Sequence, residues 1–339
     1  MNNKTISIKE IAKLADVSVA TVSRVINNNG RFSEKTGKKV REIIDKYGYT
    51  TNMAAKSLRM SKSKTIGIVV PNINNEWFSE VVLDIEKFFF ERNYSVFICN
   101  TSQDDDKEIS YFKSLDSKLV DGIICISGRE DIPADVIKRK IPIVCIDRKP
   151  KDRSDAFYVE SDHYNGGYLA TKELIEKGCK DILIVSRNKT LSVNQQRLEG
   201  YKQALIDSNI TLRNELILLL DNESANYEGT KKAVGELLDE NIKFDGVFAT
   251  NDWRAYGALI ALSERNIKVP KQVKIVGFDD IAISKYCYPT LSTIRQDTEL
   301  LCSKASNLLL DLMENNHVAS DVKHITIPVK LIQRETTSL

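Results

Sequence analysis

Apolar residues recur at helical spacing near the amino terminus and in short continuous runs after residue 64. Ile8, Ile11, Ala12 and Ala15 repeat every three or four residues, which predicts one buried helix face. An S-x-x-E sequence beginning at Ser7 is a capping box, the side-chain pair that closes a helix start. We therefore expect a first helix to begin just after Ser7.

Two further helices are predicted within the same fifty residues. Ser18 is a suitable N-cap for the second, whose inner face holds Val22 and Ile26. The third begins near Ser33, ends at Gly48 and is expected to bury four apolar residues: Val40, Ile43, Ile44 and Tyr47. Three short helices with a tight turn between the first two predict a helix-turn-helix.

The outer side of the second helix carries small and hydrogen-bonding side chains. They are Val19, Ala20, Ser23, Arg24 and Asn27. In a DNA major groove, small apolar groups contact thymine methyls, and Arg or Asn reaches base edges. A three-helix bundle with an ordinary polar exterior is the alternative that this pattern leaves open.

Charge is distributed unevenly along the chain. Residues 1–64 carry 14 Lys+Arg against 5 Asp+Glu, a net charge of +9, whereas residues 65–339 carry 35 against 42, a net charge of −7. A small basic segment on a long acidic body favours a polyanion as the partner of the basic segment.

Beyond residue 64, β-rich apolar runs alternate with helical patterns. The expected strands are Thr65–Val70, Ser95–Cys99, Gly122–Ile126, Ile143–Asp147, Asp181–Ser186, Gly246–Thr250 and Lys274–Phe278. The expected helices between them include Glu76–Glu91, Tyr164–Lys177, Gln195–Ser208, Glu228–Glu240 and Trp253–Arg265. This alternation predicts an α/β fold with parallel sheets covered on both faces, and its length predicts two lobes.

The composition is that of a globular protein, with 42% hydrophobic and 28% charged residues in 339. No apolar run approaches the roughly 20 residues of a membrane helix, and the start has no signal-peptide pattern, so a cytoplasmic location is expected. The six cysteines lack CxxC spacing, which favours buried free thiols over disulfides or zinc ligands. We expect no metal and no cofactor.

Motifs typical of enzymes are absent from the sequence. It contains no G-x-G-x-x-G, no P-loop, no G-x-S-x-G and no metal-spaced histidine pair. The acidic run Asp104–Asp106 precedes a helical pattern and is interpreted as a helix N-cap. The residues of this body alone thus predict a two-lobed ligand-binding domain without a catalytic centre.

The amino-terminal sequence SIKEIAKLADVSVATVSRVINNNGRFSEKTGKKVREIIDKYGY strongly resembles the DNA-binding head of the lactose-repressor (LacI/GalR) family. Its segment VSVATVSRVIN, residues 17–27, is close to a family signature. The resemblance implies that seven residues of this segment face DNA: Ser18, Val19, Ala20, Thr21, Ser23, Arg24 and Asn27. Gly37 departs from the family, which usually has a helix-forming residue there.

The segment TNMAAKSLR, residues 51–59, resembles the hinge helix of that family, which orders on operator DNA. Leu58 matches the hinge leucine that wedges into the minor groove. By the same resemblance Asn52, Ala55 and Arg59 are expected at the DNA.

The resemblance continues through the body, in stretches such as IGIVVPNINNEWFSEVV (67–82), VFATND (247–252) and VPKQVKIVGFDDI (269–281). It implies a periplasmic-binding-protein-type core with two lobes, three crossovers and a small-molecule cleft. The expected organisation is a head at 1–50, a hinge and linker at 51–64, and a core at 65–339. The first lobe would span about 65–161 and 293–322, and the second about 162–292 and 323–339.

Family positions for effector contacts carry over one residue at a time. They are Trp77, Phe78, Asp147, Arg148, Asp162, Arg197, Asn251 and Asp279. Carboxylate, amide and guanidinium groups around an aromatic pair suit a polyol, so a sugar or sugar phosphate is expected. For the aromatic residues core packing is the alternative interpretation, and for the polar ones it is a salt bridge or a helix cap.

The resulting hypothesis is a ligand-responsive transcriptional repressor that binds palindromic operator DNA as a homodimer. A nucleoside or purine is the alternative effector. A solute-binding protein shares the core fold but has no use for a basic helix-turn-helix. An enzyme is the third alternative.

Overall fold

The structure is a computed structural model that describes residues 6–49, 62–126, 139–148, 157–188, 192–221, 226–315 and 323–338. The chain forms two units, of which the first ends at Ser63 and the second begins at Lys64.

The first unit, the head, contains helices α1 (Ile8–Ala15), α2 (Val19–Asn27) and α3 (Glu34–Tyr47). A serine caps each helix: the hydroxyls of Ser7, Ser18 and Ser33 each accept a hydrogen bond from the backbone N–H three residues later. The capping box at Ser7 is formed in full. The three predicted helix starts are therefore confirmed.

The core of the head is less completely buried than predicted. Val22, Val25 and Val40 are buried, whereas Ile26, Ile43 and Ile44 are only half-buried and pack against them. Tyr47 was expected in the core, but 48% of its surface is exposed, whereas Tyr49, two residues later, packs against the apolar cluster of the head. Gly37 is buried, and a Cβ there would lie 2.9 Å from the Phe32 ring.

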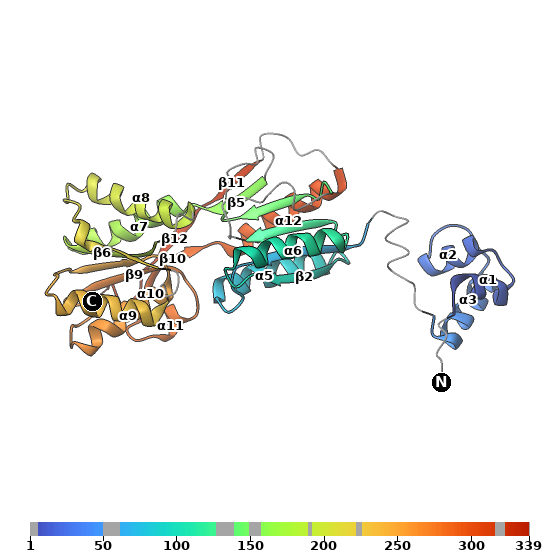
Figure 1. The fold of residues 1–339 in the computed structure, drawn as a ribbon, viewed down its shortest axis with the longest axis horizontal. Coiled ribbons are helices and arrows are strands. Elements are labelled where there is room, and N and C mark those ends of the chain that lie inside the picture. Colours follow the sequence, from blue (N-terminus) through green and yellow to red (C-terminus); the bar gives the residue numbers. More distant parts are fainter. Residues whose placement is uncertain are drawn as a thin grey trace. The chain divides into compact units, whose positions relative to one another are not determined.

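The second unit, the core, contains two six-stranded sheets (Figure 1). The first is fully parallel, in the order β11 (His324–Ile327), β5 (Phe157–Ser161), β4 (Ile143–Ile146), β3 (Gly122–Ile126), β1 (Thr65–Val70), β2 (Ser95–Asn100). The second runs β12 (Val329–Ile332), β10 (Ser292–Gln296), β9 (Lys274–Asp279), β8 (Gly246–Ala249), β6 (Ile182–Arg187), β7 (Ile217–Leu220). In the described part of this sheet, β10 and β12 pair antiparallel and the other neighbours pair parallel.

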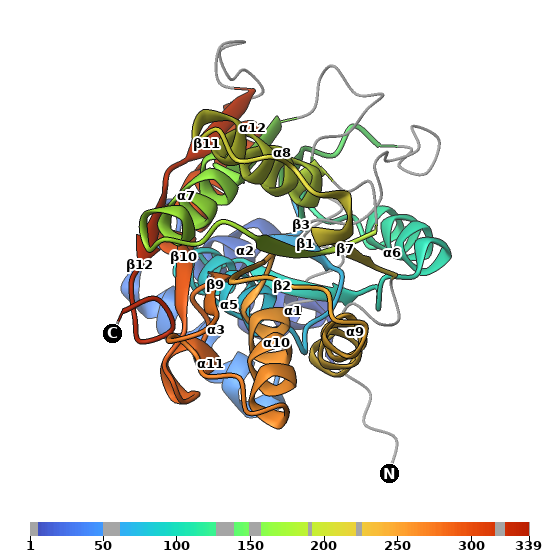
Figure 2. The ribbon, with the colours of Figure 1, turned by 90° about the vertical axis from the view of Figure 1, so that its left-hand side faces the viewer.

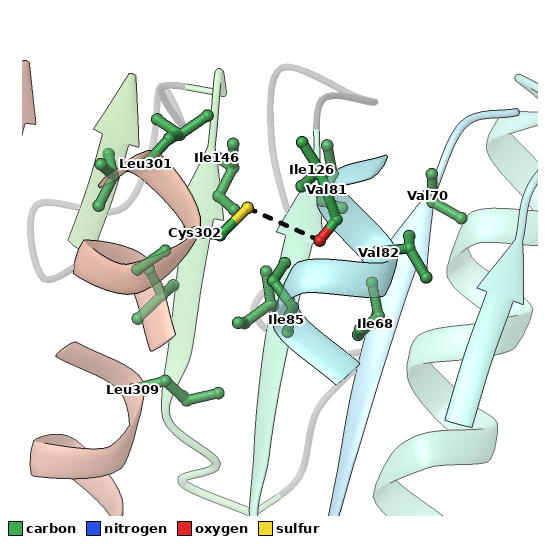
Figure 3. Close-up of a cluster of buried hydrophobic side chains, with 14 of the residues drawn as sticks. Ile68, Val70, Val81, Val82, Ile85, Ile126, Ile146, Leu301, Cys302 and Leu309 are labelled. Carbon is green, nitrogen blue, oxygen red and sulfur yellow. Dashed lines mark hydrogen bonds between the residues drawn. The ribbon is translucent and has the colours of Figure 1, made fainter. Parts of the chain in front are cut away.

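Helices cover both faces of the first sheet, and together they form the first lobe. Ile66, Ile68 and Val70 pack toward α5 (Glu76–Phe90) and α12 (Thr298–Asn315), whereas Val69 packs toward α6 (Asp105–Ser117). Figure 3 shows α5 and α12 meeting over the sheet, where the Cys302 thiol donates to the carbonyl oxygen of Val81 at 3.7 Å. The side-chain alternation of a strand thus builds a core on each face.

The second lobe has the same layered plan around the second sheet. Helices α7 (His163–Glu176) and α8 (Ser192–Asp207) lie on one face, and α9 (Tyr227–Asp239) and α10 (Asp252–Glu264) lie on the other (Figure 2). The short elements η1 (Asn214–Leu216) and α11 (Ile283–Tyr286) complete this lobe.

The chain crosses between the lobes three times, and the second and third crossings lie later than the sequence predicted. Strand β10 belongs to the second sheet and β11 to the first. The second crossover therefore follows Gln296, and the third lies between Ile327 and Val329, a few residues later than the expected breaks at 292/293 and 322/323. Both shifts arise because strand pairing, which the local sequence does not reveal, assigns these short strands.

The predicted strands and helices of the core match the structure to within three residues at either end. Asp104 caps α6 through the N–H groups of Asp106 and Lys107, as expected from the acidic run. All six cysteines are buried free thiols. In the described ranges, no helix has the length and apolar character needed to cross a membrane.

Candidate effector site and DNA-binding helix

The close packing of α7 and α8 determines the position of Arg197. A Cβ on Gly167 of α7 would lie 2.1 Å from the carbonyl oxygen of Arg197, and a Cβ on Gly200 of α8 would lie 2.0 Å from that of Tyr164. Only glycine permits this approach of the two backbones. Arg197 consequently lies beside the first residue of α7, His163.

A buried chain of hydrogen bonds connects the two lobes at this point. The Asp147 carboxylate follows β4 of the first lobe and lies 2.8 Å from Nε2 of His163 in the second. On the other side of the ring, Nδ1 lies 3.3 Å from Nε of Arg197. Because arginine can only donate, Nδ1 is the acceptor, and Nε2–H then donates to Asp147.

The guanidinium of Arg197 has further partners in the second lobe. It donates to the Thr250 carbonyl oxygen at 2.5 Å, stacks 3.6 Å from the centre of the Phe278 ring and lies 3.7 Å from the Asp279 carboxylate. Asp279 also accepts from Gln296 at 2.8 Å. We name Asp147, His163, Arg197, Thr250 and Asp279 the inter-lobe site.

Burial shifts the pKa values at the inter-lobe site. It raises the pKa of Asp279 to about 6, against the opposing charge of Arg197. It also lowers the pKa of Arg197 and raises that of the neighbouring Asp252. Perturbed ionisable groups at the ends of parallel strands are typical of binding sites in open α/β sheets.

Two more arginines lie next to this site. Arg254 of α10 donates to the Thr250 hydroxyl at 3.1 Å, and only 6% of Arg254 is exposed. Arg187 ends β6 and donates to the side-chain oxygen of Gln103 in the first lobe. We name Arg187, Arg197 and Arg254 the arginine cluster.

The aromatic pair Trp77–Phe78 opens α5 on the side of the first lobe. The two rings meet edge to face at a centroid distance of 5.3 Å. Trp77 belongs to the same apolar cluster as Ile281 of the second lobe. Its buried Nε1 has no hydrogen-bond partner in the described part of the chain, which is unusual for an indole N–H.

Three of the expected contact residues are engaged elsewhere. Arg148 forms a buried ion pair with Glu108 at 2.8 Å inside the first lobe. Asp162 caps α7, and Asn251 caps α10. These contacts agree with the salt-bridge and helix-cap interpretations. The structure therefore brings Asp147, Arg197 and Asp279 together, and leaves Arg148 outside that group.

Sequence reasoning missed His163, Thr250, Arg187 and Arg254. His163 and Thr250 directly adjoin positions that were predicted, since they follow Asp162 and precede Asn251. A buried arginine in the first turn of a helix gives no periodic signal, so Arg254 could be recognised only from the fold.

On the head, the seven expected DNA-contacting residues lie at the start and along the outer side of α2. Ser18, Val19, Ala20, Arg24 and Asn27 are exposed, and Thr21 and Ser23 are half-buried. The Asn27 amide donates to the Ser23 carbonyl oxygen at 2.7 Å. The hinge residues Asn52, Ala55, Leu58 and Arg59 lie outside the described residues.

Comparison with known proteins identifies the family that has this head and this two-lobed core. The chain is 34% identical to the HTH-type transcriptional regulator RegA of Clostridium saccharobutylicum, over 98% of this chain and 99% of that protein. Residues 7–52 match the bacterial regulatory proteins of the lacI family. The chain belongs to the LacI family. It is a DNA-binding transcriptional regulator of that family.

Other LacI-type proteins resemble it along nearly the whole length. The HTH-type transcriptional repressor PurR of Actinobacillus pleuropneumoniae serotype 3 (strain JL03) is 33% identical over 97% of this chain and 98% of its own. Residues 171–337 match the periplasmic binding protein-like domain.

Solved structures confirm the fold. The Lac repressor dimer bound to operator and the anti-inducer ONPF superposes with a TM-score of 0.86 at 24% identity, covering 98% of this chain and 99% of that one. A LacI family regulator from Enterococcus faecium with bound ribose has a TM-score of 0.70 at 29% identity, covering 80% and 98%. The expected head and two-lobed parallel-sheet core are both present.

Proposed function

We propose that this LacI-family regulator is a repressor whose operator affinity is controlled by a polyhydroxylated effector, a sugar or sugar phosphate, at the inter-lobe site. The proposed DNA contacts are the seven residues of α2 and the four hinge residues named above. Such a regulator works in the cytoplasm, where bacterial DNA lies. The relatives that it resembles are transcriptional regulators.

The observation that carries this proposal is the buried chain Asp147–His163–Arg197–Asp279. It connects side chains of both lobes through two hydrogen bonds and one ion pair at the ends of parallel strands. A ligand that exchanges bonds with this series changes the free energy of one lobe arrangement relative to another. Control of DNA binding requires such a difference.

The chemistry of the series suits vicinal hydroxyl groups. Arg197 offers several fixed donors, and the Asp279 carboxylate is an acceptor for two hydroxyl protons. Both are buried, so their hydrogen bonds to a ligand are not in competition with bulk water. The bound ribose of the Enterococcus faecium relative is consistent with this ligand class.

A purine is a second candidate, favoured by the Trp77–Phe78 pair. Aromatic faces stack on a purine, and the buried Trp77 Nε1–H is a donor for a ring nitrogen or carbonyl. The name of the relative PurR agrees with this alternative.

The test begins by selecting operator DNA from a random pool with the full chain. The affinity for that DNA is then measured with ribose, glucose, their phosphates, hypoxanthine and guanine. We expect one sugar or sugar phosphate to change the affinity and Arg197→Ala to remove the response. A response to the purines alone would replace the sugar by the second candidate. DNA binding that no member of the panel alters counts against effector control by these classes.

We further propose that the regulator is a homodimer through its core. Leu83 and Phe90 of α5 are exposed, and Tyr286 and Tyr288 are 81% and 88% exposed. Large apolar side chains exposed on the core are available to become buried against a second copy. Sedimentation is expected to show a dimer, and a Leu83→Lys, Tyr288→Lys variant is expected to be monomeric. Leu14→Lys, a change of an exposed leucine in the head, is the matched control.

A further inference from the structure

We infer that Glu76 is a positioning residue of this regulator, whose bond to the backbone at Ala282 holds the two lobes together and keeps Asp279 in place for the effector. The inference rests on the proposed function, because Asp279 is one of the proposed effector contacts. It adds a residue that the family resemblance did not assign, and it gives the first lobe a means to act on a carboxylate of the second.

Glu76 reaches across the lobe boundary from the start of α5. Its Oε1 accepts a hydrogen bond from the backbone N–H of Ala282 at 3.0 Å, although 206 positions separate the two residues. Asn75 is the N-cap of α5 and accepts from the N–H groups of Trp77 and Phe78, so the start of this helix does not need the Glu76 carboxylate. The carboxylate is therefore available to the second lobe.

The other end of this bond is a helix start that has no side-chain cap. Ala282 occupies the N-cap position of α11, and its methyl side chain cannot accept a hydrogen bond. In a capping box, a glutamate three residues later in the same helix binds the N-cap backbone N–H. At α11 a glutamate of the other lobe binds this N–H, so the helix start is completed only when the lobes are together.

The segment that precedes α11 is strained. Asp279 and Asp280 have positive φ angles, 110° and 58°, in a region that is uncommon for residues other than glycine. Such a backbone persists only where its surroundings determine it. Gln296 donates to Asp279 at 2.8 Å, and Arg334 donates to Asp280 at 2.6 Å. The position of the Asp279 carboxylate therefore depends on the residues that bind this segment.

Consecutive N–H groups at the end of the segment bind carboxylates of different lobes. The Ile281 N–H donates to Oδ2 of Asp252 in the second lobe at 2.9 Å, and the next N–H, that of Ala282, donates to Glu76. Among the described side chains that hydrogen-bond to residues 279–282, Glu76 alone comes from the first lobe. Parting of the lobes removes this bond, three residues from Asp279.

Apolar side chains of both lobes surround the bond. Trp77 and Ile281 are buried in one apolar cluster with the first sheet, and Trp253 of α10 packs against that cluster. Ile283 packs against apolar clusters of both lobes. Glu76 is half-buried beside this patch, and partial shielding from water strengthens its hydrogen bond. The bond and the patch thus stabilise the same lobe arrangement.

The primary test uses the tryptophan emission of the full chain and needs no effector. The chain has two tryptophans, so Trp77→Phe leaves Trp253 as the reporter of its contact with the first lobe. In this background we expect Glu76→Ala to shift the Trp253 emission to longer wavelength and to increase its quenching by acrylamide, because the lobes part and water reaches the indole. Glu76→Gln keeps an acceptor oxygen and should retain most of the signal of the Trp77→Phe parent.

Glu80→Ala in the same background is the matched control. Glu80 lies one turn later on α5 and accepts from the Thr298 hydroxyl at 3.3 Å inside the first lobe. Its removal takes one carboxylate from the same helix without a change at the lobe boundary, so the emission should stay the same. A cooperative melting transition shows that each variant is folded. Equal emission and quenching of Glu76→Ala and the parent, or an equal change in Glu80→Ala, would overturn the inference.

Calorimetric titration separates this inference from the proposed function. Ribose, glucose, their phosphates, hypoxanthine and guanine are titrated into the wild type, Glu76→Ala and Glu76→Gln. For a compound that binds the wild type, we expect Glu76→Ala to lower the affinity roughly five- to hundredfold and Glu76→Gln to restore most of it. Unchanged affinity in Glu76→Ala contradicts the inference alone. If no compound binds the wild type, the proposed effector classes are wrong, and the Trp253 emission still decides the role of Glu76.

Discussion

The two lobes share one architecture, yet their buried arginines are in opposite situations. Arg148 of the first lobe is paired with Glu108 at 2.8 Å and lies 2.6 Å from the Cys125 sulfur. Burial alone would lower the pKa of Arg148, but these acidic neighbours raise it above its ordinary value. Arg254 of the second lobe lies among other cations, and its pKa falls.

The difference separates an arginine paired with a carboxylate inside one lobe from an arginine placed near other arginines. An ion pair inside the fold needs no further partner. Removing one of its two members leaves the other charge buried without compensation. Arg254 lies close to two other arginines, and perturbed ionisable groups of this kind are common at binding sites. The buried arginines of the two lobes therefore differ in their electrostatic surroundings.

The largest effect is expected from breaking the pair in the first lobe. Arg148→Met leaves Glu108 buried without its cation, which should lower the free energy of unfolding by about 3–5 kcal/mol. Urea unfolding of the full chain measures this loss. The double variant Arg148→Met, Glu108→Leu removes both charges and should recover much of it. Equal stability of the single variant and the wild type would show that this arginine is not structural.

Asp279→Asn should weaken effector binding by about 1.5–3 kcal/mol, because a charged acceptor is lost. The same change should raise the melting temperature of the ligand-free protein at pH 7. Burial raises the pKa of Asp279 to about 6, so the fold favours its neutral form. The stability that this neutral form contributes is lost as pH rises through 6, whereas asparagine stays neutral and retains it at pH 7. Calorimetric titration and a melting curve measure the two effects. A lower melting temperature with intact affinity would assign Asp279 a structural role instead.

Arg24 in the head is exposed, so it extends the comparison from buried arginines to one at the surface. Arg24→Ala should weaken operator binding by about 1–3 kcal/mol if it contacts a base edge, with no change in effector affinity. Binding is followed by fluorescence anisotropy between 50 and 200 mM salt. Lys13→Ala on α1 is a control for the loss of one exposed positive charge of the head. Equal effects of both changes would mean that Arg24 contributes only charge.

The smallest effect is expected from pH. If the carboxylate form of Asp279 binds the effector, the affinity should fall as pH drops through about 6, by roughly tenfold between pH 7 and pH 5. Titrations across this range with the wild type and Asp279→Asn isolate its contribution, since the variant should show a flatter profile. Identical profiles would assign the pH dependence to another group.

Sequence reasoning recovered most of the fold because central strands and amphipathic helices are locally encoded. Strands Thr65–Val70 and Gly122–Ile126 were predicted to the residue, since buried parallel strands are continuously apolar. Five strands were not among the predicted ones: β5, β7, β10, β11 and β12. Polar residues interrupt all of them except β7, and β7, β11 and β12 are sheet edges, so the local pattern of a central buried strand is missing or short.

The site was less accessible to prediction. Asp147, Arg197 and Asp279 were named from the family resemblance and lie together. Which partner an arginine meets depends on the packing of distant segments: 84 positions separate Gln103 from Arg187. That is why Arg148 could not be distinguished from Arg197 by sequence, and why Arg254 was missed.

The last two strands have a consequence for how the protein is made. Strand β11 closes one edge of the first sheet against β5, and β12 closes one edge of the second against β10. A ribosome releases these strands after all the other strands of the two sheets, so each lobe has an unpaired sheet edge until they emerge. A nascent chain stopped near residue 320 would contain nearly all of both hydrophobic cores but complete neither sheet. Its two unpaired sheet edges would be sites of aggregation that a chaperone could cover.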